Sequence, residues 1–126
     1  MFLSRCLPAL FILLLLGGGP ADAADGVDLS GTFDGFYIDK GRTNRRKNLR
    51  LRIRHRGEQL QADAADNTMW ITGLVVEDRV FVEWEHASGE RGEGIWNILD
   101  SGNRLEGTWT SAGSSSFFGV WEFTRR

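Results

Sequence analysis

The stretch Leu105-Glu106-Gly107-Thr108-Trp109 carries a pattern that this chain repeats. A large apolar residue, a glycine two positions on and an aromatic residue two positions further also occur in Leu29–Phe33 and Phe117–Trp121. In a β-strand, residues two apart lie on one face, so each copy places an apolar side chain, a gap and an aromatic ring on the same side of a sheet. A glycine in that place lets a strand bend or lets a ring from another strand approach closely. The repeat therefore predicts a small closed β-barrel.

Apolar and polar residues alternate along eight segments of the chain, which is the pattern of half-buried β-strands. Short turn-forming stretches join most of them, so strands adjacent in sequence are expected to pair as antiparallel hairpins. The expected strands are 29–38, 47–56, 59–64, 68–76, 79–86, 93–99, 104–110 and 117–125. An all-β fold follows, in which an eight-stranded antiparallel up-and-down meander closes into a small barrel by pairing its first and last strands. A two-sheet β-sandwich is the alternative architecture.

The alternation also predicts which side chains point into the barrel. In the second expected strand, Leu51 and Ile53 share one face with His55, and arginines occupy the other face. The apolar face is the expected inner face, because burying unpaired arginines is very costly. The candidates for lining the lumen are Trp84, Trp109 and Trp121. These rings either fill the lumen or contact a small apolar ligand there, and the pattern leaves the direction of Trp70 and Trp96 open.

The N-terminus has the three parts of a secretory signal peptide. Arg5 supplies a positive charge, Leu7–Leu16 is an apolar run, and Ala21-Asp22-Ala23 fits the small-residue cleavage pattern. The run is about ten residues long, whereas a membrane-spanning helix needs roughly 20, so no transmembrane anchor is predicted. We therefore expect residues 1–23 to be a signal peptide cleaved near Ala23 and residues 24–126 to form a single barrel domain. The mature protein is expected to be periplasmic or extracellular.

Positive charge is concentrated in residues 40–56, which hold nine lysines and arginines and no acidic residue. The rest of the mature chain holds five basic and sixteen acidic residues, whereas protein surfaces usually mix the two signs. Four of the arginines alternate on the outer face of the second expected strand, and most of the other basic residues lie in the loop before it. The candidate anion-binding residues are Lys40, Arg42, Arg45, Arg46, Lys47, Arg50, Arg52, Arg54 and Arg56.

Two interpretations of this basic segment stay open. In the first, it binds an anionic ligand or an acidic protein partner. In the second, neighbouring carboxylates neutralise it, and the candidate partners are Glu58, Asp63, Glu83 and Glu85. Proteins that bind single-stranded nucleic acid combine basic residues with aromatic side chains on which bases stack. Residues 40–56 contain no Phe, Tyr or Trp, which argues against nucleic acid as the ligand.

No motif for catalysis or for a cofactor is found in the sequence. His55 and His86 are expected on the inner face but at opposite ends of the barrel, too far apart to share a metal ion. The glycine-rich stretch 89–94 lacks the spacing and the following helix of a nucleotide-binding loop. Ser114-Ser115-Ser116 lacks the sequence context of a nucleophilic serine. We therefore predict a non-enzymatic protein with no catalytic residue, metal or cofactor.

The chain resembles a known group of small barrels. Its opening, Asp28-Leu29-Ser30-Gly31-Thr32-Phe33, is similar to the first strand of an avidin, with Phe33 where a tryptophan is usual. The short strands with Gly-Thr-Phe, Leu-Glu-Gly-Thr-Trp and Gly-Val-Trp look like those of avidins and lipocalins, and of small exported bacterial domains built on a repeated Gly-x-Trp pattern. The resemblance implies a fold. The polar biotin contacts of avidin have no counterparts that can be placed on this sequence, so biotin binding is not implied.

Taken together, these features favour a small exported barrel that binds an anionic ligand or an acidic protein through the basic segment at 40–56. A first alternative is an inhibitor-type or envelope accessory protein that contacts its partner through the loops at 39–46 and 111–116. A second alternative is a carrier that holds a small apolar ligand in the lumen.

Overall fold

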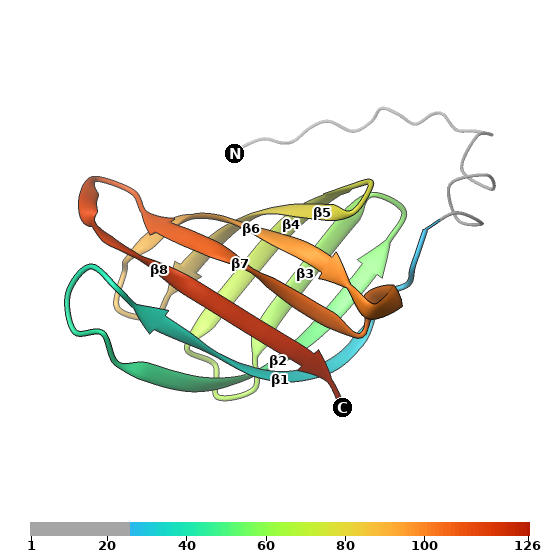
Figure 1. Cartoon of the computed structure of the whole chain (residues 1–126), viewed down its shortest axis with the longest axis horizontal. Helices are drawn as coiled ribbons and strands as arrows, with labels where there is room; N and C mark the ends of the chain where they lie inside the picture. The colour runs from blue at the N-terminus through green and yellow to red at the C-terminus, as the bar shows by residue number, and fades with distance from the viewer. Residues whose placement is uncertain (1–25) are drawn as a thin grey trace.

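The computed structural model describes residues 26–126, except for the side chains of residues 114–117. The predicted signal peptide and its cleavage point near Ala23 lie outside the described residues. Residues 26–126 form eight strands in one meander (Figure 1), and their bounds are β1 (Gly31–Asp39), β2 (Arg46–Arg56), β3 (Gln59–Ala64), β4 (Met69–Val76), β5 (Arg79–His86), β6 (Arg91–Leu99), β7 (Arg104–Ser111) and β8 (Ser114–Arg125). A 3-10 turn, η2 (Asp100–Gly102), separates β6 from β7. Within residues 26–126, no helix has the length and the apolar character needed to cross a membrane.

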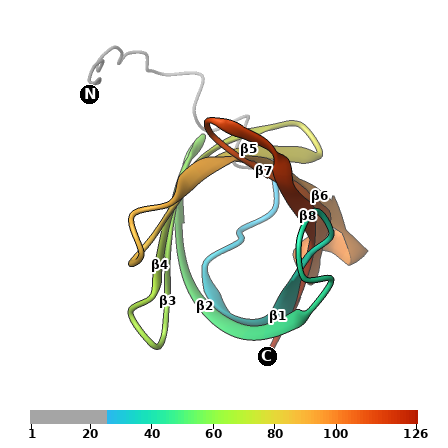
Figure 2. The same cartoon turned by 90° about the vertical axis from the view of Figure 1, so that its left-hand side faces the viewer.

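Each strand pairs antiparallel with the next, and β8 pairs with β1 to complete a closed barrel. Figure 2 shows the strands as a ring. At the closing pair, Gly35 lies opposite Phe123 and Tyr37 lies opposite Trp121. The predicted eight-stranded antiparallel barrel is confirmed, and the alternative β-sandwich is wrong. Closure leaves no exposed strand edge among these eight strands, so binding through an added strand is not available to them.

The strict alternation of the strands places one apolar set inside the barrel. In β2, for example, Leu49, Leu51 and Ile53 are buried while the residues between them are exposed. The largest fully buried side chains come from all eight strands and from the chain before β1, and they are Trp96, Phe33, Phe123, Leu29, Leu51, Leu60, Ile71, Leu105 and Val80. A single core therefore runs through the barrel and makes its wall rigid.

The repeated glycines lie where neighbouring backbones and rings come close. A Cβ atom placed on Gly107 would lie 1.7 Å from the carbonyl oxygen of Ile95 on β6. A Cβ atom on Gly119 would lie 1.7 Å from the carbonyl oxygen of Ile38 on β1 and 2.8 Å from the ring of Trp109. The glycines thus do what the repeat predicts, because they admit a neighbouring strand or a core ring where no side chain fits.

One end of the barrel, which we call the terminal end, is crossed by the chain that precedes β1. Figure 2 shows residues 26–30, in light blue, passing across the ring of strands. Leu29 is fully buried in the core, and its backbone N–H donates to Nδ1 of His55 at 3.0 Å. The guanidinium of Arg125 in β8 donates to the carbonyl oxygen of Ser30 at 2.6 Å. The opposite end, which we call the loop end, carries the connections β1–β2, β3–β4, β5–β6 and β7–β8.

Several predicted strand bounds differ from the structure by one to three residues. The sequence predicts a loop over 111–116, but β7 runs to Ser111 and β8 begins at Ser114. Gly113 has φ +82°, and glycine adopts this conformation without strain, so a tight turn replaces the loop. At the other end of the domain, β1 begins at Gly31 instead of residue 29.

Candidate functional site

The outer surface of β2 carries the predicted arginine row. Arg50, Arg52, Arg54 and Arg56 are all exposed and alternate with buried residues. The other predicted basic residues lie towards the loop end, in the β1–β2 connection or at the start of β2, and they are Lys40, Arg42, Arg45, Arg46 and Lys47. The structure therefore brings Arg50, Arg52, Arg54 and Arg56 onto one outer surface of β2, and Arg46 lies at the loop end of the same strand. We call the outer surface of β1, β2 and β3, together with these arginines, the arginine face.

Two carboxylates from the neighbouring strands contact the arginine face. Arg50 lies opposite Asp34 of β1 and forms an ion pair with it at 2.6 Å. Arg52 and Arg54 both contact Asp63 of β3, at 2.7 and 3.2 Å. The hydrogen bonds from Arg50 and Arg52 hold the pKa values of Asp34 and Asp63, respectively, below their usual range. Both carboxylates are therefore ionised at neutral pH and fix the arginine side chains in place.

Neutralisation by these carboxylates is incomplete. Arg126 also contacts Asp34, at 3.3 Å, so that two carboxylates serve four guanidinium groups. The side chains of Arg50, Arg52 and Arg54 are 47%, 55% and 66% exposed, so their charges remain accessible to a ligand. Ion pairs this exposed contribute only about 0–1 kcal/mol each. The arginine face is therefore ordered, positively charged and open to solvent.

The predicted partners of the arginines are partly wrong. Asp63 is a partner, as expected, whereas Asp34 was not among the candidates. Glu83 and Glu85 lie on the outer surface of β5, three strands away from β2. Asp34 is identified only by the register of the β1–β2 hairpin, which places it opposite Arg50.

Two aromatic side chains from outside the basic segment border the arginine face. The guanidinium of Arg46 lies 3.8 Å from the centre of the Phe36 ring, a distance at which a cation and a ring attract each other. Trp70 of β4 points outwards, is 45% exposed and lies opposite Asp63. An open surface hollow beside Phe36 is lined by Arg46 and Arg50 and also by the carboxylates of Asp34, Asp66 and Glu122. Aromatic rings thus lie beside the guanidinium groups at this surface, which the composition of residues 40–56 alone does not indicate.

The three lumen candidates all point into the barrel, where they pack tightly. Trp84 and Trp109 are 5.7 Å apart in an edge-to-face contact, and Trp121 contacts Trp96 in the same manner at 5.5 Å. The indole N–H groups of Trp84, Trp109 and Trp121 donate to strand carbonyl oxygens. Trp96 is fully buried, and its Nε1 has no hydrogen-bond partner among the described residues. Most of the polar atoms of these rings are thus bonded to the barrel itself, and this geometry favours a filled lumen.

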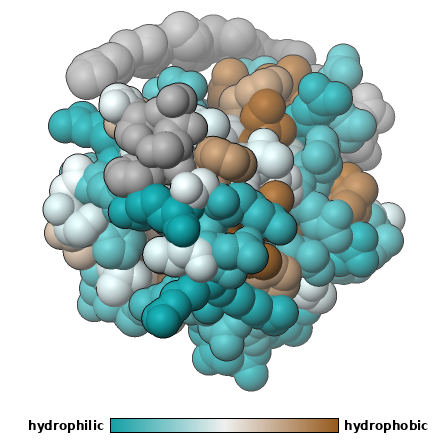
Figure 3. Space-filling view, turned by 60° about the vertical axis from the view of Figure 1, so that its left-hand side comes forward, coloured by the Kyte–Doolittle hydropathy of each residue, from teal (hydrophilic) through white to brown (hydrophobic). Residues whose placement is uncertain are grey.

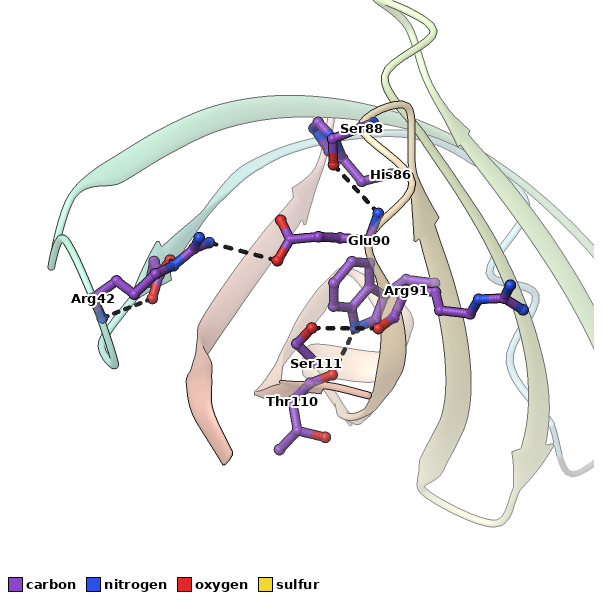
Figure 4. Close-up of polar contacts among 9 residues, drawn as sticks. Arg42, His86, Ser88, Glu90, Arg91, Thr110 and Ser111 are labelled. Carbon is purple, nitrogen blue, oxygen red and sulfur yellow. Dashed lines mark hydrogen bonds and ion pairs between the residues drawn. The ribbon is translucent and has the colours of Figure 1, made fainter. Parts of the chain in front are cut away.

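At the loop end, Arg42 joins two connections that lie on opposite sides of the barrel. Its guanidinium contacts Asp39 at 2.8 Å and Glu90 of the β5–β6 connection at 3.7 Å (Figure 4). Beneath these contacts Tyr37 is half-buried, and burial raises the pKa of its hydroxyl. In the space-filling view of Figure 3, which brings this end forward, hydrophilic residues form most of the surface and hydrophobic residues appear as separate spots among them.

The two histidines lie at opposite ends of the barrel, as their positions in the sequence predict. His55 at the terminal end accepts the N–H of Leu29, and His86 at the loop end contacts the hydroxyl of Ser88 at 3.0 Å (Figure 4). Each histidine therefore takes part in a local hydrogen bond. Within residues 26–126, no group of three or more histidine, cysteine, aspartate or glutamate side chains is arranged to hold a metal ion.

A second surface hollow lies on the outside of β4 to β7 and was missed by the sequence analysis. We call it the acidic groove, and its outward-facing residues are Thr72, Leu74, Phe81, Glu83, Glu93, Ile95, Thr108 and Thr110. Leu74 lies opposite Phe81, which lies opposite Ile95, so three apolar side chains form one row across three strands. In the next row Glu83 lies opposite Glu93. The sequence alone does not show this groove, because Leu74, Phe81 and Ile95 are far apart in it. Only the pairing of β4 with β5 and of β5 with β6 brings the three side chains together.

Comparison with known proteins identifies the architecture but no family. No family model matches the chain, and no curated protein matches it. Among solved structures, a de novo designed fluorescence-activating β-barrel is similar, with a TM-score of 0.55 and 17% sequence identity over 83% of this chain and 98% of that chain. At this identity the similarity shows the fold alone. The resemblance to avidins and lipocalins therefore extends to the small-barrel architecture and is not supported at the level of a family.

Proposed function

We propose that the protein is an exported, non-catalytic binding module that recognises an acidic partner through the arginine face. The observation that carries this proposal is the sharing of two carboxylates, Asp34 and Asp63, among four guanidinium groups. A surface meant only for stability gains more from one carboxylate for each arginine, since like charges on one face repel each other. The excess of positive charge is better explained by an anion that arrives from outside.

The barrel gives this surface a fixed spacing. Side chains two apart on one strand face are about 6.6–6.8 Å apart, and the closed ladder holds β2 between β1 and β3. Because the arginines are already ordered by Asp34 and Asp63, little side-chain freedom is lost when a ligand binds. The recognised feature is therefore a row of negative charges, such as an acidic protein surface or an extended polyanion.

Retention on immobilised heparin, eluted with a salt gradient, tests the proposal. Heparin serves as a generic polyanion, and binding that depends on released counterions weakens steeply as salt rises. The double variant R52Q/R54Q should elute at a clearly lower salt concentration than the unchanged protein. The matched control is R79Q/R91Q, because Arg79 and Arg91 are exposed on β5 and β6, away from the arginine face.

The two variants have the same net charge, so they separate a defined surface from overall charge. Equal shifts in the two variants would show that net charge alone governs retention. Absence of salt-sensitive retention of the unchanged protein at low ionic strength would likewise rule out the arginine face as a polyanion-binding surface.

A further inference from the structure

The acidic groove contains a charge arrangement that the barrel itself does not balance. Glu83 and Glu93 lie directly opposite each other on β5 and β6, and like charges in this position destabilise a sheet. Neither carboxylate forms an ion pair within the described part of the chain. Arg91 lines an adjoining hollow with both carboxylates but forms no ion pair with either of them, so the groove presents two negative charges side by side without a directly bonded counter-ion among the described residues.

An apolar row runs beside these carboxylates. Leu74 and Phe81 are 46% and 44% exposed, and Ile95 continues the row onto β6. Exposed apolar residues that are adjacent in space mark interaction surfaces more often than single exposed ones do. A fitting partner therefore carries cationic groups on long apolar stems, which is the chemistry of arginine.

The same chain carries such a surface on the opposite side of its barrel. The arginine face is centred on β2, and β6 in the acidic groove is four strands away in the ring of eight. The two surfaces of one molecule consequently cannot meet. Within the chain, Arg46 over Phe36 at 3.8 Å and Arg125 over Phe33 at 4.8 Å already show arginine stacked on phenylalanine, which is the contact that Phe81 offers.

We infer that the acidic partner of the arginine face is the acidic groove of a second copy of this chain. This inference rests on the function proposed above and names its partner. Arg52 and Arg54 would lie beside Glu83 and Glu93 of the neighbouring copy, with the arginine stems over Phe81. Two different surfaces meet in this contact, so one copy keeps an unused acidic groove and the other an unused arginine face. The assembly therefore grows head to tail, as a chain or a ring.

Sedimentation velocity over a range of protein concentrations tests the inference. At low salt the unchanged protein should form dimers and longer assemblies, and the dissociation constant should rise about tenfold or more by about 0.5 M salt, because salt screens exposed charges. The variants R52E/R54E and E83K/E93K should each be monomeric. Mixed in equal amounts, they should assemble again, because the first retains a working groove and the second a working arginine face, and the two altered surfaces are themselves opposite in charge.

Matched variants exclude changes in net charge and loss of folding. E58K/E77K changes the charge as E83K/E93K does, but places it in turns at the terminal end, and it should still assemble. The neutral variant E83Q/E93Q removes the repulsion, so its free energy of unfolding should be equal to or higher than that of the unchanged protein while its assembly weakens. A merely unfolded variant cannot give this combination.

The outcomes distinguish this inference from the proposed function. If the unchanged protein is retained on heparin but stays monomeric at low salt and high concentration, the arginine face binds anions and the inference is wrong. If the protein is neither retained nor assembled, both fail. If the unchanged protein assembles but the two mixed charge variants do not combine, the contact uses other surfaces and the inference is again wrong.

Discussion

The substitution Gly107→Ala tests the physical reason for the repeated glycines. The Cβ atom of alanine would lie 1.7 Å from the carbonyl oxygen of Ile95, whereas real Cβ atoms essentially never come closer than 3.0 Å to such an atom. Strands β6 and β7 would have to separate by more than about 1 Å there. Inserting an atom into a packed interior costs about 1–3 kcal/mol, and each ladder hydrogen bond lost on either side costs about 0.5–1.5 kcal/mol. We expect the free energy of unfolding to fall by about 3 kcal/mol.

Urea denaturation followed by tryptophan fluorescence measures this change. In a domain of this size each 1 kcal/mol lowers Tm by roughly 4–8 °C, so thermal unfolding should show a decrease of about 12 °C or more. The control is Gly57→Asn, because nothing lies within 4 Å of a Cβ atom at Gly57 and its φ of +62° is one that asparagine tolerates. A loss of less than about 1 kcal/mol in Gly107→Ala, or an equal loss in the control, would refute the steric explanation of the repeat.

Three further predictions concern the carboxylates of the arginine face and the chain end. Asp63→Asn should shift elution from heparin to higher salt, because it releases Arg52 and Arg54 from their shared carboxylate; unchanged or earlier elution would contradict this. In the folded state the pKa values of Asp34 and Asp63 are lowered from 3.8. The stability that these two carboxylates contribute is therefore present above pH 3.8 and is lost as the pH falls from 3.8 through the lowered pKa values. In urea titrations at decreasing pH, the double variant D34N/D63N should therefore lose less stability than the unchanged protein, and an equal loss would contradict the assignment. Arg125→Ala should increase hydrogen exchange at the amides of Leu29 and Ser30. The reason is that Arg125 donates to the carbonyl oxygens of Asp28 and Ser30 at 2.7 and 2.6 Å. Arg125→Lys should give an intermediate effect, since lysine lacks the planar fork of arginine.

The strands were predictable because period-two alternation and the glycines act locally. In β2 and β5 the buried and exposed residues alternate so regularly that the inner face follows from the sequence. In β4, by contrast, both faces are mostly apolar, so alternation alone does not show that Met69 and Ile71 point inwards and Trp70 outwards. The direction of Trp70 depends on what β3 and β5 place beside it, and this is a property of the whole barrel.

The candidate site was predicted only in part, because contacts between strands depend on register. The basic residues of β2 are visible in the sequence, but the pairing of Arg50 with Asp34 requires the alignment of β1 with β2. The acidic groove requires two further alignments, β4 with β5 and β5 with β6, before Leu74, Phe81 and Ile95 form a row. Sequence spacing gives the face of each residue, and the closed barrel determines its neighbours.

The hydrogen bonds of the arginine face show how the surface proposed for binding can be paired with carboxylates and still keep free donors. Arg52 and Arg54 each reach Asp63 through one terminal nitrogen, although a guanidinium group has five N–H donors. An incoming carboxylate, sulfate or phosphate can accept hydrogen bonds from the remaining donors while Asp63 stays in place. Because the strand fixes the arginines about 6.6–6.8 Å apart, a single small anion contacts one or two of them, whereas an extended row of negative charges contacts all four. The arginine face should therefore discriminate by the spacing of negative charges, and short heparin fragments should bind it much more weakly than long ones at equal charge concentration.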